Sequence, residues 1–527
     1  MKKFLTLIAL LCVLISGKSQ NYFEKMITSS YGGLWEGMYS LETPDHGFII
    51  SCNVADQCSN TGLLLLLSSD GETIKELKHQ ISDNNLNYIG LFKMPGEEWR
   101  CLAVAVITKH DTNVQNSLAF VEFDENLEIT GENICEFGDD YTSMSVDCGY
   151  PRSVMNSDGT ITMVARCRRS GGEHYLYANM NTEGEIIRMK EEAVTNLTYL
   201  SNLFARNNDS KDCVVLRYEE RGSEFCNRLD STMSTSRMFR LSGTDVKIVE
   251  YDPPHPYTID TIYRYYSIPG NGLSCDDSTF FITGRCHYFK SLGGITGDCS
   301  FIAKVNDDGD VMDSRIWDIQ KEDGQSVWSA FRKALAATGD AVYHAGVIGI
   351  QDHSHKPKPS VVTITKFDKE MNVKWHRYIG RDGAYYDINV IEGTEDGGCI
   401  CTGIYSRKGN YHDFKIYALK LDADGFDSTG ELGEGMVKPY YCFPNPANES
   451  LNIEFSPDVN CRSVEIYSID GRLVETFPET SPETSPETSP STSHPTTIDI
   501  SNLTHGMYIL KVKTADGKEY TERIVKE

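Results

Sequence analysis

Short strand-like runs separated by turn residues fill most of this chain. The stretch from Met371 to Gly425 shows the pattern most clearly, because apolar and aromatic residues alternate there with polar ones in three or four short runs. Polar and glycine-rich turns divide the runs, as in YYDINVIEGTEDGGCICTGIYS. Alternation with a period of two predicts half-buried β-strands joined by tight turns. We therefore expect this stretch to form one small antiparallel sheet.

Two sequence markers repeat along the chain, and their last copies lie in this stretch. The first is a strand that runs into an acidic or glycine turn, and it ends at Gly71, Asn126, Gly184, Thr244, Gly309, Glu370 and Gly425, roughly 55 to 65 residues apart. The second is a turn followed by a strand, and it begins at Pro44, Pro95, Ser157, Asn208, Asp276, Thr338 and Glu395. The two series interleave without a gap, and the best-preserved copies carry Lys304, Lys366 and Lys420 in the same register.

Repeats of this length indicate a radial arrangement of sheets. One unit is too small to bury both faces of its sheet, whereas units placed around an axis bury each sheet against the next. Seven units over residues 20–430 predict an all-β fold, a seven-bladed β-propeller. Six or eight blades, or a split pair of sandwiches, are the alternatives. The repeat lacks a Trp-Asp or paired-Gly kelch signature and resembles the DGG-type propeller repeats of secreted bacterial proteins.

The first residues have the order of a secretory signal peptide. The chain opens with MKK and continues with an apolar run to Ser16. Gly17 and Ser19 are small residues that fit cleavage before Gln20, so residues 1–19 are predicted to be removed. No later segment approaches the ~20 apolar residues that a membrane helix needs. We expect an exported protein without a transmembrane segment.

The pattern changes after residues 431–441, which have the character of a linker. From Cys442 the chain reads CFPNPANESLNIEF, then SVEIYSIDGRLVET and LTHGMYILKV. The order of these motifs resembles the C-terminal sorting domain of the type IX secretion system over residues 442–527. The matching positions are Pro444, Asn445, Pro446, Asp470, Gly471, Gly506 and Tyr508. Residues 478–495, PETSPETSPETSPSTSHP, depart from the family pattern, and we expect this insert to be a disordered loop.

The resemblance implies a small seven-stranded sandwich that the translocon of the type IX system recognises. In that family the domain is usually removed on arrival, and the cargo is released or fixed to surface lipopolysaccharide. The implied location is the medium or the outer surface of a Gram-negative bacterium, reached through the periplasm. An adhesive sandwich domain without an export role is the alternative.

Length and charge limit the number of domains and the kinds of partner that we expect. A chain of 527 residues exceeds what one core usually holds, so at least two domains are expected. The formal net charge is −26, and no basic stripe is present to neutralise phosphates. Nucleic acid is therefore excluded as a partner, and docking on an anionic membrane is disfavoured.

The cysteines fit an oxidising compartment. The chain has 16, and an odd number remains once Cys12 is cleaved away with the signal peptide. Three pairs share a separation of thirteen residues, and we expect them to form disulfides, with buried free thiols as the alternative: Cys135/Cys148, Cys213/Cys226 and Cys286/Cys299. Cys399 and Cys401 alternate on one strand and should face the same way without bonding each other.

Candidate ligand-binding residues gather in the loops that a propeller places around one end of its channel. Aromatic rings interleaved with Arg, His and Asp suit a carbohydrate, because rings stack on sugars while charged groups bind hydroxyls or carboxylates. The predicted residues are Trp35, Tyr141, Arg168, His174, Tyr257, His287, Trp328, Tyr385, Tyr411 and His412. The alternative is that exposed loops are simply polar and that the aromatic residues pack.

No motif for a metal, a cofactor or a catalytic centre is complete. His353 and His355 lack carboxylate partners, and the run from Asp422 to Asp427 lacks the spacing of a calcium loop. The acidic pairs at Glu219 and Asp307 could serve glycoside hydrolysis, but solvated turn residues are the alternative. We expect no cofactor and a binding protein rather than an enzyme. A lyase or glycosidase that uses the same face, and a structural protein of a surface assembly, remain as rivals.

Overall fold

In the computed structural model the described residues run from 22 to 526 with gaps, the longer of which are 145–151, 206–212, 242–267, 318–326, 350–359, 426–439 and 479–495. Every element within the described residues is a β-strand, as the alternation predicted. The chain divides into two compact units, Met1–Ala423 and Asp424–Glu527.

The described strands of the first unit form seven antiparallel sheets of four or five strands. The first three sheets contain β2 (Leu34–Glu42), β3 (Phe48–Asp56), β4 (Ser59–Leu67) and β5 (Thr73–Lys78); β6 (Asn85–Lys93), β7 (Cys101–Thr108), β8 (Ser117–Phe123) and β9 (Ile129–Glu136); and β10 (Tyr141–Ser143), β11 (Arg152–Met155), β12 (Ile161–Arg169), β13 (Gly172–Met180) and β14 (Ile186–Ala193).

Four further sheets follow in chain order. They contain β15 (Thr198–Ala205), β16 (Cys213–Glu219), β17 (Glu224–Leu229) and β18 (Thr235–Leu241); β19 (Ile268–Ser274), β20 (Thr279–Phe289), β21 (Ile295–Asn306) and β22 (Val311–Trp317); β23 (Val327–Ser329), β24 (Leu335–Thr338), β25 (Ala341–Ile348), β26 (Val361–Asp368) and β27 (Val373–Ile379); and β28 (Tyr385–Gly393), β29 (Cys399–Ser406), β30 (Lys415–Leu421) and β1 (Phe23–Ile27). We call the last of these the closing sheet.

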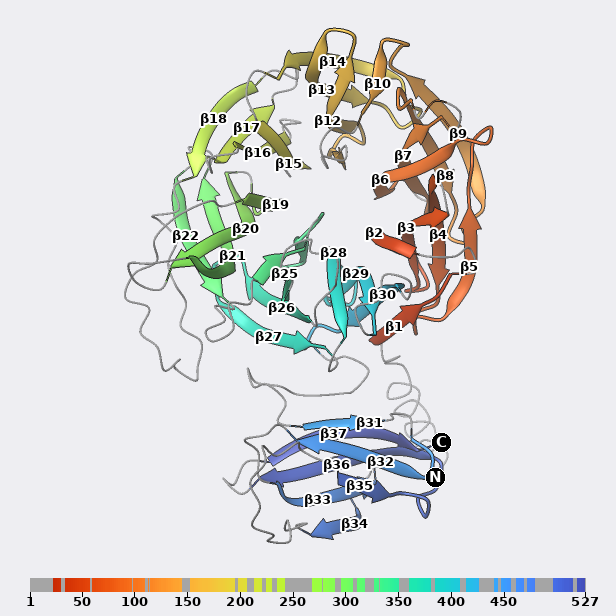
Figure 1. Ribbon diagram of the computed structural model, residues 1–527, viewed down its shortest axis with the longest axis vertical. Coiled ribbons are helices and arrows are strands. Elements are labelled where there is room, and N and C mark those ends of the chain that lie inside the picture. Colours follow the sequence, from red (N-terminus) through yellow and green to blue (C-terminus); the bar gives the residue numbers. More distant parts are fainter. Residues whose placement is uncertain are drawn as a thin grey trace, which may run out of the picture. The chain divides into compact units, whose positions relative to one another are not determined.

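Neighbouring sheets contact one another through their inner strands. β6 contacts β2 and β11, β15 contacts β11 and β19, and β24 contacts β19 and β28. The closing sheet then returns to the start, because β28 contacts β2. Figure 1 shows the resulting arrangement of sheets around a central axis. The fold of this unit is therefore propeller-like.

The second sequence marker identifies the second strand of a sheet in all seven copies. The first marker identifies the third strand in six copies, from β4 to β30. The prediction is wrong for the copy that ends at Thr244, because its strand is β18, the outermost strand of its sheet. Both β17 and β18 run into an acidic or glycine residue, Asp230 and Gly243 respectively, so this marker does not distinguish the two strands.

The stretch from Met371 to Gly425 is not one sheet, contrary to our expectation. Its first strand, β27, pairs with β26 of the preceding sheet, and only β28 to β30 belong to the closing sheet. The fourth strand of the closing sheet is β1, which pairs with β30 from Phe23 opposite Lys420 to Ile27 opposite Ile416. The sequence repeat is thus offset by one strand from the sheets, and an N-terminal strand completes the last of them.

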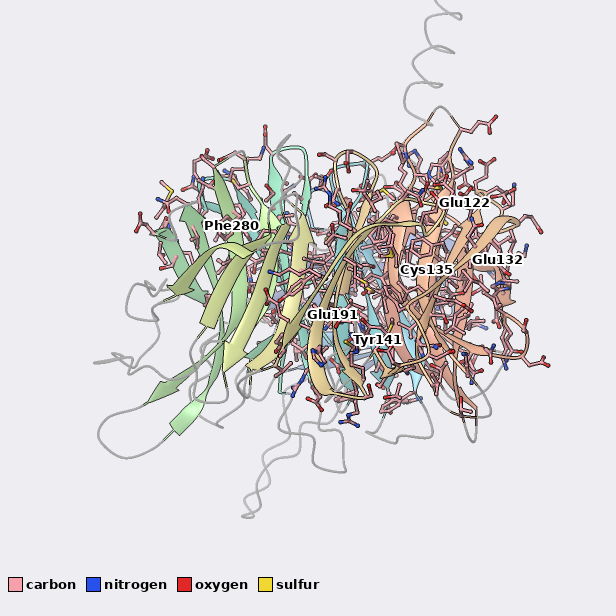
Figure 2. All side chains as sticks on the ribbon, turned by 90° about the horizontal axis from the view of Figure 1, so that it is seen from above. Glu122, Glu132, Cys135, Tyr141, Glu191 and Phe280 are labelled. Atoms are coloured by element: carbon pink, nitrogen blue, oxygen red, sulfur yellow. The ribbon has the colours of Figure 1, made fainter. Side chains whose placement is uncertain are left out.

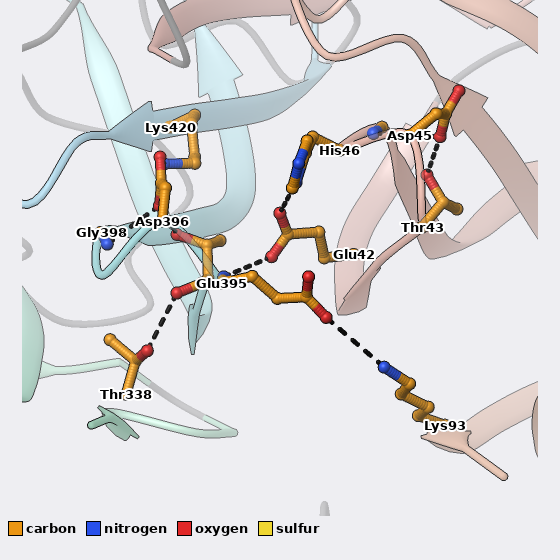
Figure 3. Close-up of polar contacts among 12 residues, drawn as sticks. Glu42, Thr43, Asp45, His46, Lys93, Thr338, Glu395, Asp396, Gly398 and Lys420 are labelled. Carbon is orange, nitrogen blue, oxygen red and sulfur yellow. Dashed lines mark hydrogen bonds and ion pairs between the residues drawn. The ribbon is translucent and has the colours of Figure 1, made fainter. Parts of the chain in front are cut away.

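Polar contacts join three sheets where the closing sheet meets the start of the unit (Figure 3). Glu42 at the end of β2 accepts hydrogen bonds from His46 Nδ1 at 2.9 Å and from the backbone N of Glu395 at 2.7 Å. Glu395 also pairs with Lys93 of β6 at 3.5 Å. The hydrogen bond to Glu42 raises the pKa of His46. These groups supplement the apolar packing of Phe23, which stacks edge-on against Phe48.

The three lysines that share a register in the sequence make two kinds of contact, one between sheets and one within a sheet. Lys304 Nζ donates to the carbonyl of Lys369 at 3.0 Å, and Lys366 Nζ donates to the carbonyl of Ala423 at 2.6 Å, so each reaches a turn of the next sheet. Lys420 instead pairs with Asp396 of its own sheet at 2.8 Å and is only 2% exposed. The sheet that follows the closing sheet around the axis is the first sheet. There the contact comes from Lys25 of β1 in the closing sheet, which pairs with Glu72 of the first sheet.

The two faces of β25 contact different neighbours. Tyr343, Ala345 and Val347 point toward the closing sheet and join an apolar cluster with residues such as Leu419. The alternate position, His344, points toward the sheet of β19 to β22. Its Nε2 lies 3.2 Å from both Ser300 Oγ and Ser329 Oγ, whereas Val342 joins a smaller apolar cluster nearer the turns.

Two of the three predicted disulfides are wrong. Cys135 is a free, buried thiol. Cys213 lies opposite Leu229 and Cys226 lies opposite Leu216, so these two cysteines are out of register by three residues. Cys286 and Cys299 lie directly opposite each other. Cys399 and Cys401 are both free and buried in the same apolar cluster, which confirms that they face the same way.

The C-terminal unit is a sandwich of two sheets. One contains β31 (Tyr440–Phe443), β32 (Ser450–Phe455) and β35 (Thr496–Asp499), and the other contains β33 (Cys461–Ser468), β34 (Leu473–Pro478), β36 (Gly506–Thr514) and β37 (Glu519–Lys526). The core lies between them and includes Ile453, Ile466, Ile498 and Leu510. Tyr508, Leu510 and Val512 are buried in alternation along β36.

Candidate functional site

Three of the ten predicted ligand-binding residues come together at one end of one sheet. Tyr141 begins β10, Arg168 lies near the end of β12, and His174 lies near the start of β13. The strand register explains this, because Tyr141 pairs with Arg169 while Cys167 pairs with His174. The tight turn between β12 and β13 folds the charged ends of both strands onto each other. This end of the sheet is our candidate site.

Two arginines of β12 share one carboxylate. Arg166 and Arg168 alternate along the strand and therefore lie on the same face, and both pair with Glu173 of β13, at 2.5 and 2.9 Å. The hydrogen bond from Arg168, with that from Arg166, lowers the pKa of Glu173. The Arg166 side chain is 7% exposed, whereas that of Arg168 is 57% exposed. Arg168 thus presents a guanidinium to solvent beside the pair formed by the buried Arg166 and the partly exposed Glu173.

Arg169 organises the other face of this strand end. It pairs with Asp140 and, at 2.5 Å, with Glu191 of β14, and its guanidinium lies 5.3 Å from the ring centroid of Tyr141. The Tyr141 hydroxyl donates to Glu191, and Figure 2 labels both residues in this sheet. Burial raises the pKa of Glu191, and the charge of Asp140 adds to this effect. We call Asp140, Tyr141, Arg166, Arg168, Arg169, Glu173 and Glu191 the arginine cluster.

The arginine cluster suits binding better than catalysis. Its three guanidinium groups are balanced by three carboxylates, so it does not form a strong anion site. Tyr141 is 2% exposed, and its ring packs against Phe137, so it holds Arg169 in place and cannot stack on a ligand in this conformation. The pair of Arg168 and Glu173 is partly exposed, so it contributes little to stability, and Arg168 lies where a ligand can reach it.

A cysteine–histidine pair for nucleophilic catalysis is absent from this site. Cys167 Sγ contacts His174, but it does so through the backbone carbonyl at 3.4 Å. Burial raises the pKa of Cys167 to about 11, so at neutral pH it is a thiol and not a thiolate nucleophile. His174 is half-buried on the adjoining strand.

The other predicted residues lie elsewhere or outside the described residues. Tyr385 begins β28 in the closing sheet, where its hydroxyl lies 3.4 Å from Asp387 and its ring 6.0 Å from that of Phe414. Trp35, His287 and Trp328 lie in β2, β20 and β23, whose side chains at these positions are not described. Tyr257, Tyr411 and His412 fall outside the described residues, as do His353, His355 and the acidic pair that begins at Asp307.

Sequence reasoning missed the residues that organise the site. Glu173 and Glu191 were not among the candidates, nor was the buried Arg166. The signal was present in RCRRSGGEH, where charges flank a tight turn and opposite charges face each other once the strands pair. Among the described residues no three His, Cys, Asp or Glu side chains gather as a metal site would require.

Comparison with known proteins adds a firm result for the C-terminal unit. Residues 441–527 match the family described as secretion system C-terminal sorting domain. This unit belongs to the type IX sorting family. The sorting domain implies export, and it implies an interaction with the secretion system. Of its predicted motif, Gly506 and Tyr508 lie in β36, where the Tyr508 hydroxyl donates to the carbonyl of Thr504 at 2.9 Å.

The remaining predicted sorting positions, Pro444, Asn445, Pro446, Asp470 and Gly471, fall outside the described residues. The described residues include no helix that is long and apolar enough to span a membrane. No curated protein matches the chain.

Solved structures resemble the chain only distantly. Drosophila Semaphorin 1a, extracellular domains 1-2, has 9% identity and a TM-score of 0.42 over 77% of this chain and 89% of its own. Polysaccharide lyase Uly1 has 10% identity and a TM-score of 0.40 over 78% of this chain and 93% of its own. Drosophila Plexin A in complex with Semaphorin 1b has 10% identity and a TM-score of 0.36 over 76% and 88%. Similarity at this level indicates neither a ligand nor an activity.

Proposed function

We propose that this protein is made with a signal peptide over residues 1–19, crosses the periplasm, and is exported by the type IX system to the cell surface or the medium. The sorting domain at residues 441–527 supports this export route. Residues 20–430 are the cargo, and residues 431–441 link the cargo to the sorting domain.

Deletion of residues 442–527 tests whether the protein is exported by the type IX system. The expected result is that the truncated chain accumulates in the periplasm, because the translocon no longer has a domain to recognise. The measurement is fractionation of cells followed by immunoblotting of the periplasm, the surface and the medium. The full-length Arg168→Ala variant is the control and should reach the surface normally. Surface levels equal to those of the full-length protein after deletion would refute the assignment.

We infer that the cargo is a seven-bladed β-propeller closed by β1. The seven sheets within the described residues and the contact of β28 with β2 support this arrangement. Closure by an N-terminal strand joins the two ends of the cargo in one sheet, so the ring does not depend on the C-terminal unit.

We propose that the propeller binds a glycan through the arginine cluster. The observation that carries the proposal is the position of Arg168, whose side chain is 57% exposed and pairs with Glu173, which also pairs with the buried Arg166. A guanidinium fixed in this way can donate two parallel hydrogen bonds to the hydroxyl or carboxylate oxygens of a sugar. His174 adds a second polar group at the same strand end.

Binding to a glycan array, followed by titration of the best ligand, tests this proposal. Arg168→Ala should weaken binding about tenfold or more, because one charge-assisted hydrogen bond contributes about 1.5 to 3 kcal/mol. Arg100→Ala is a matched control, since Arg100 is 41% exposed and pairs with Glu122 at 3.2 Å in another sheet. Unchanged affinity of the Arg168→Ala variant would place the binding site elsewhere.

The same assay separates binding from catalysis. If the wild-type protein cleaves the glycan and His174→Ala abolishes turnover while affinity is retained, the protein is a carbohydrate-active enzyme. If no glycan binds and the purified chain self-associates, a structural role in a surface assembly replaces the proposal.

A further inference from the structure

Within the described residues, the pairing of β20 with β21 extends further than the pairing of either strand with its other neighbour. β19 pairs with β20 only as far as Arg285, and β22 pairs with β21 only from Ser300. Beyond those residues the two strands pair only with each other within the described residues. We call residues 286–289 and 295–299 the ribbon.

Cys286 and Cys299 form the first residue pair of the ribbon and lie directly opposite each other. Directly opposite residues in antiparallel strands have Cα atoms about 4.5 to 5.5 Å apart, whichever type of pair they form. This separation falls inside the range of about 4.4 to 6.8 Å that a disulfide spans. Opposite residues also project from the same face of a sheet. The backbone register therefore meets the requirement for a bond.

A second cysteine pair with the same spacing provides an internal contrast. Cys213 and Cys226 also lie on the second and third strands of a sheet and are also thirteen residues apart. Their register is shifted by three residues, which separates them by about 10 Å along the strands. That distance is too great for a disulfide. The distinction between the two pairs thus comes from the register and not from the spacing.

We propose that Cys286 and Cys299 form a disulfide in the exported protein and that this bond closes the base of the ribbon. The proposal rests on the proposed export, because such bonds persist outside the cytoplasm. The two thiols lose two electrons and two protons to a disulfide-bearing oxidant, which is reduced to its dithiol. The bond keeps the next pair, His287 opposite Asp298, in register at the end of the ribbon that presents a predicted ligand-binding residue.

Peptide mapping tests the bond directly. The exported protein is collected in iodoacetamide without reductant and digested with trypsin, which cuts after Arg285, Lys290 and Lys304 and so separates the two cysteines. The expected product is CHYFK joined to SLGGITGDCSFIAK, with neither cysteine alkylated until reductant is added. The peptides that contain Cys213 and Cys226 are the matched control and should be alkylated without reductant.

Refolding of the full-length chain in a glutathione redox buffer separates this proposal from the export proposal. If the two peptides are joined after refolding but fractionation finds the chain inside the cell, the export proposal is contradicted and the proposed bond is not. A pair joined after refolding but alkylated in the exported protein overturns the proposed bond, and so does alkylation of both cysteines in both samples.

The role of the bond has a separate measurement. In the folded protein, Cys286→Ser together with Cys299→Ser should speed tryptic cleavage after Lys290 several-fold, whereas Cys213→Ser together with Cys226→Ser should not. Equal cleavage rates in the two variants would show that the bond does not hold the ribbon.

Discussion

The two faces of β25 pack against neighbouring sheets through different kinds of side chains. Toward the closing sheet, residues such as Tyr343 and Tyr386 bury apolar and aromatic surface, and the Tyr386 ring lies 5.1 Å from that of Tyr417. Toward the sheet of β19 to β22, the buried groups include His344, which meets Ser300 and Ser329. One strand thus separates an apolar interface from one in which a hydrogen-bonded group lies beside a smaller apolar cluster, because successive side chains point to opposite faces.

The difference teaches that like sheets need not be joined by like interfaces. Apolar packing is non-directional, so it stabilises the ring without fixing one residue opposite another. The hydroxyl and imidazole groups have strict geometry, because an unsatisfied buried donor or acceptor costs about 1 to 3 kcal/mol. We infer that the apolar interface supplies more of the stability, and that the polar one sets how its two sheets align.

The largest expected effect comes from the apolar interface. Leu419→Ala should lower the free energy of unfolding by about 2 to 5 kcal/mol, because Leu419 is fully buried and its truncation leaves a cavity. Urea denaturation followed by fluorescence measures the change. Ile129→Ala is the control, since Ile129 is 42% exposed and should alter stability by less than about 0.5 kcal/mol. Equal losses in the two variants would contradict the packing described for β25.

A smaller effect is expected from the polar interface. His344→Leu should cost about 1 to 3 kcal/mol, because it leaves Ser300 and Ser329 without the imidazole. The triple variant with Ser300→Ala and Ser329→Ala should recover part of this loss, since apolar groups then replace the imidazole and the two hydroxyls that contact it. Chemical denaturation compares the three proteins. If the triple variant is no more stable than His344→Leu alone, hydrogen bonding is not what distinguishes this face.

The smallest effect is a pH dependence in the same sheet as Ser300. Burial opposes ionisation of Asp276, but hydrogen bonds from Thr279 and Ser278 outweigh it and lower the pKa to about 2. A lowered pKa contributes stability above the unfolded pKa near 4, and this contribution is lost as pH falls from about 4 toward 2. Asp276→Asn should therefore show a shallower loss of stability over that window. Urea denaturation from pH 2 to 6 measures it, and identical slopes would exclude the carboxylate as a contributor.

The turns were predictable because their chemistry is local. The seven turn-then-strand markers all identify second strands, since acidic and glycine residues supply the capping oxygens and the positive φ angles that tight turns need. Gly71, Gly184 and Gly425 have φ near 80° at equivalent turns. Leu127 and Met371 occupy the same position at φ of 58° and 65°, and both are buried, so apolar packing there compensates for an unfavourable backbone conformation.

The candidate site was only partly predictable. Arg168 and His174 were found because they lie beside a turn that the sequence marks. Glu173 and Glu191 were missed because their partners depend on which strands pair and in which register. The buried position of Tyr141 was also invisible, since an aromatic residue at a strand end has the same local signal whether it packs or projects.

By itself the sequence determined the strands, most of the turns and the export address, because each depends on neighbouring residues or on a short motif. Only the tertiary structure decided that β1 completes the closing sheet, that Cys286 and not Cys213 has a cysteine opposite it, and that Arg168 shares Glu173 with the buried Arg166. These features join residues far apart in the chain or depend on register. A shift of a few residues along a strand leaves the local pattern almost unchanged, yet it changes every partner across the sheet.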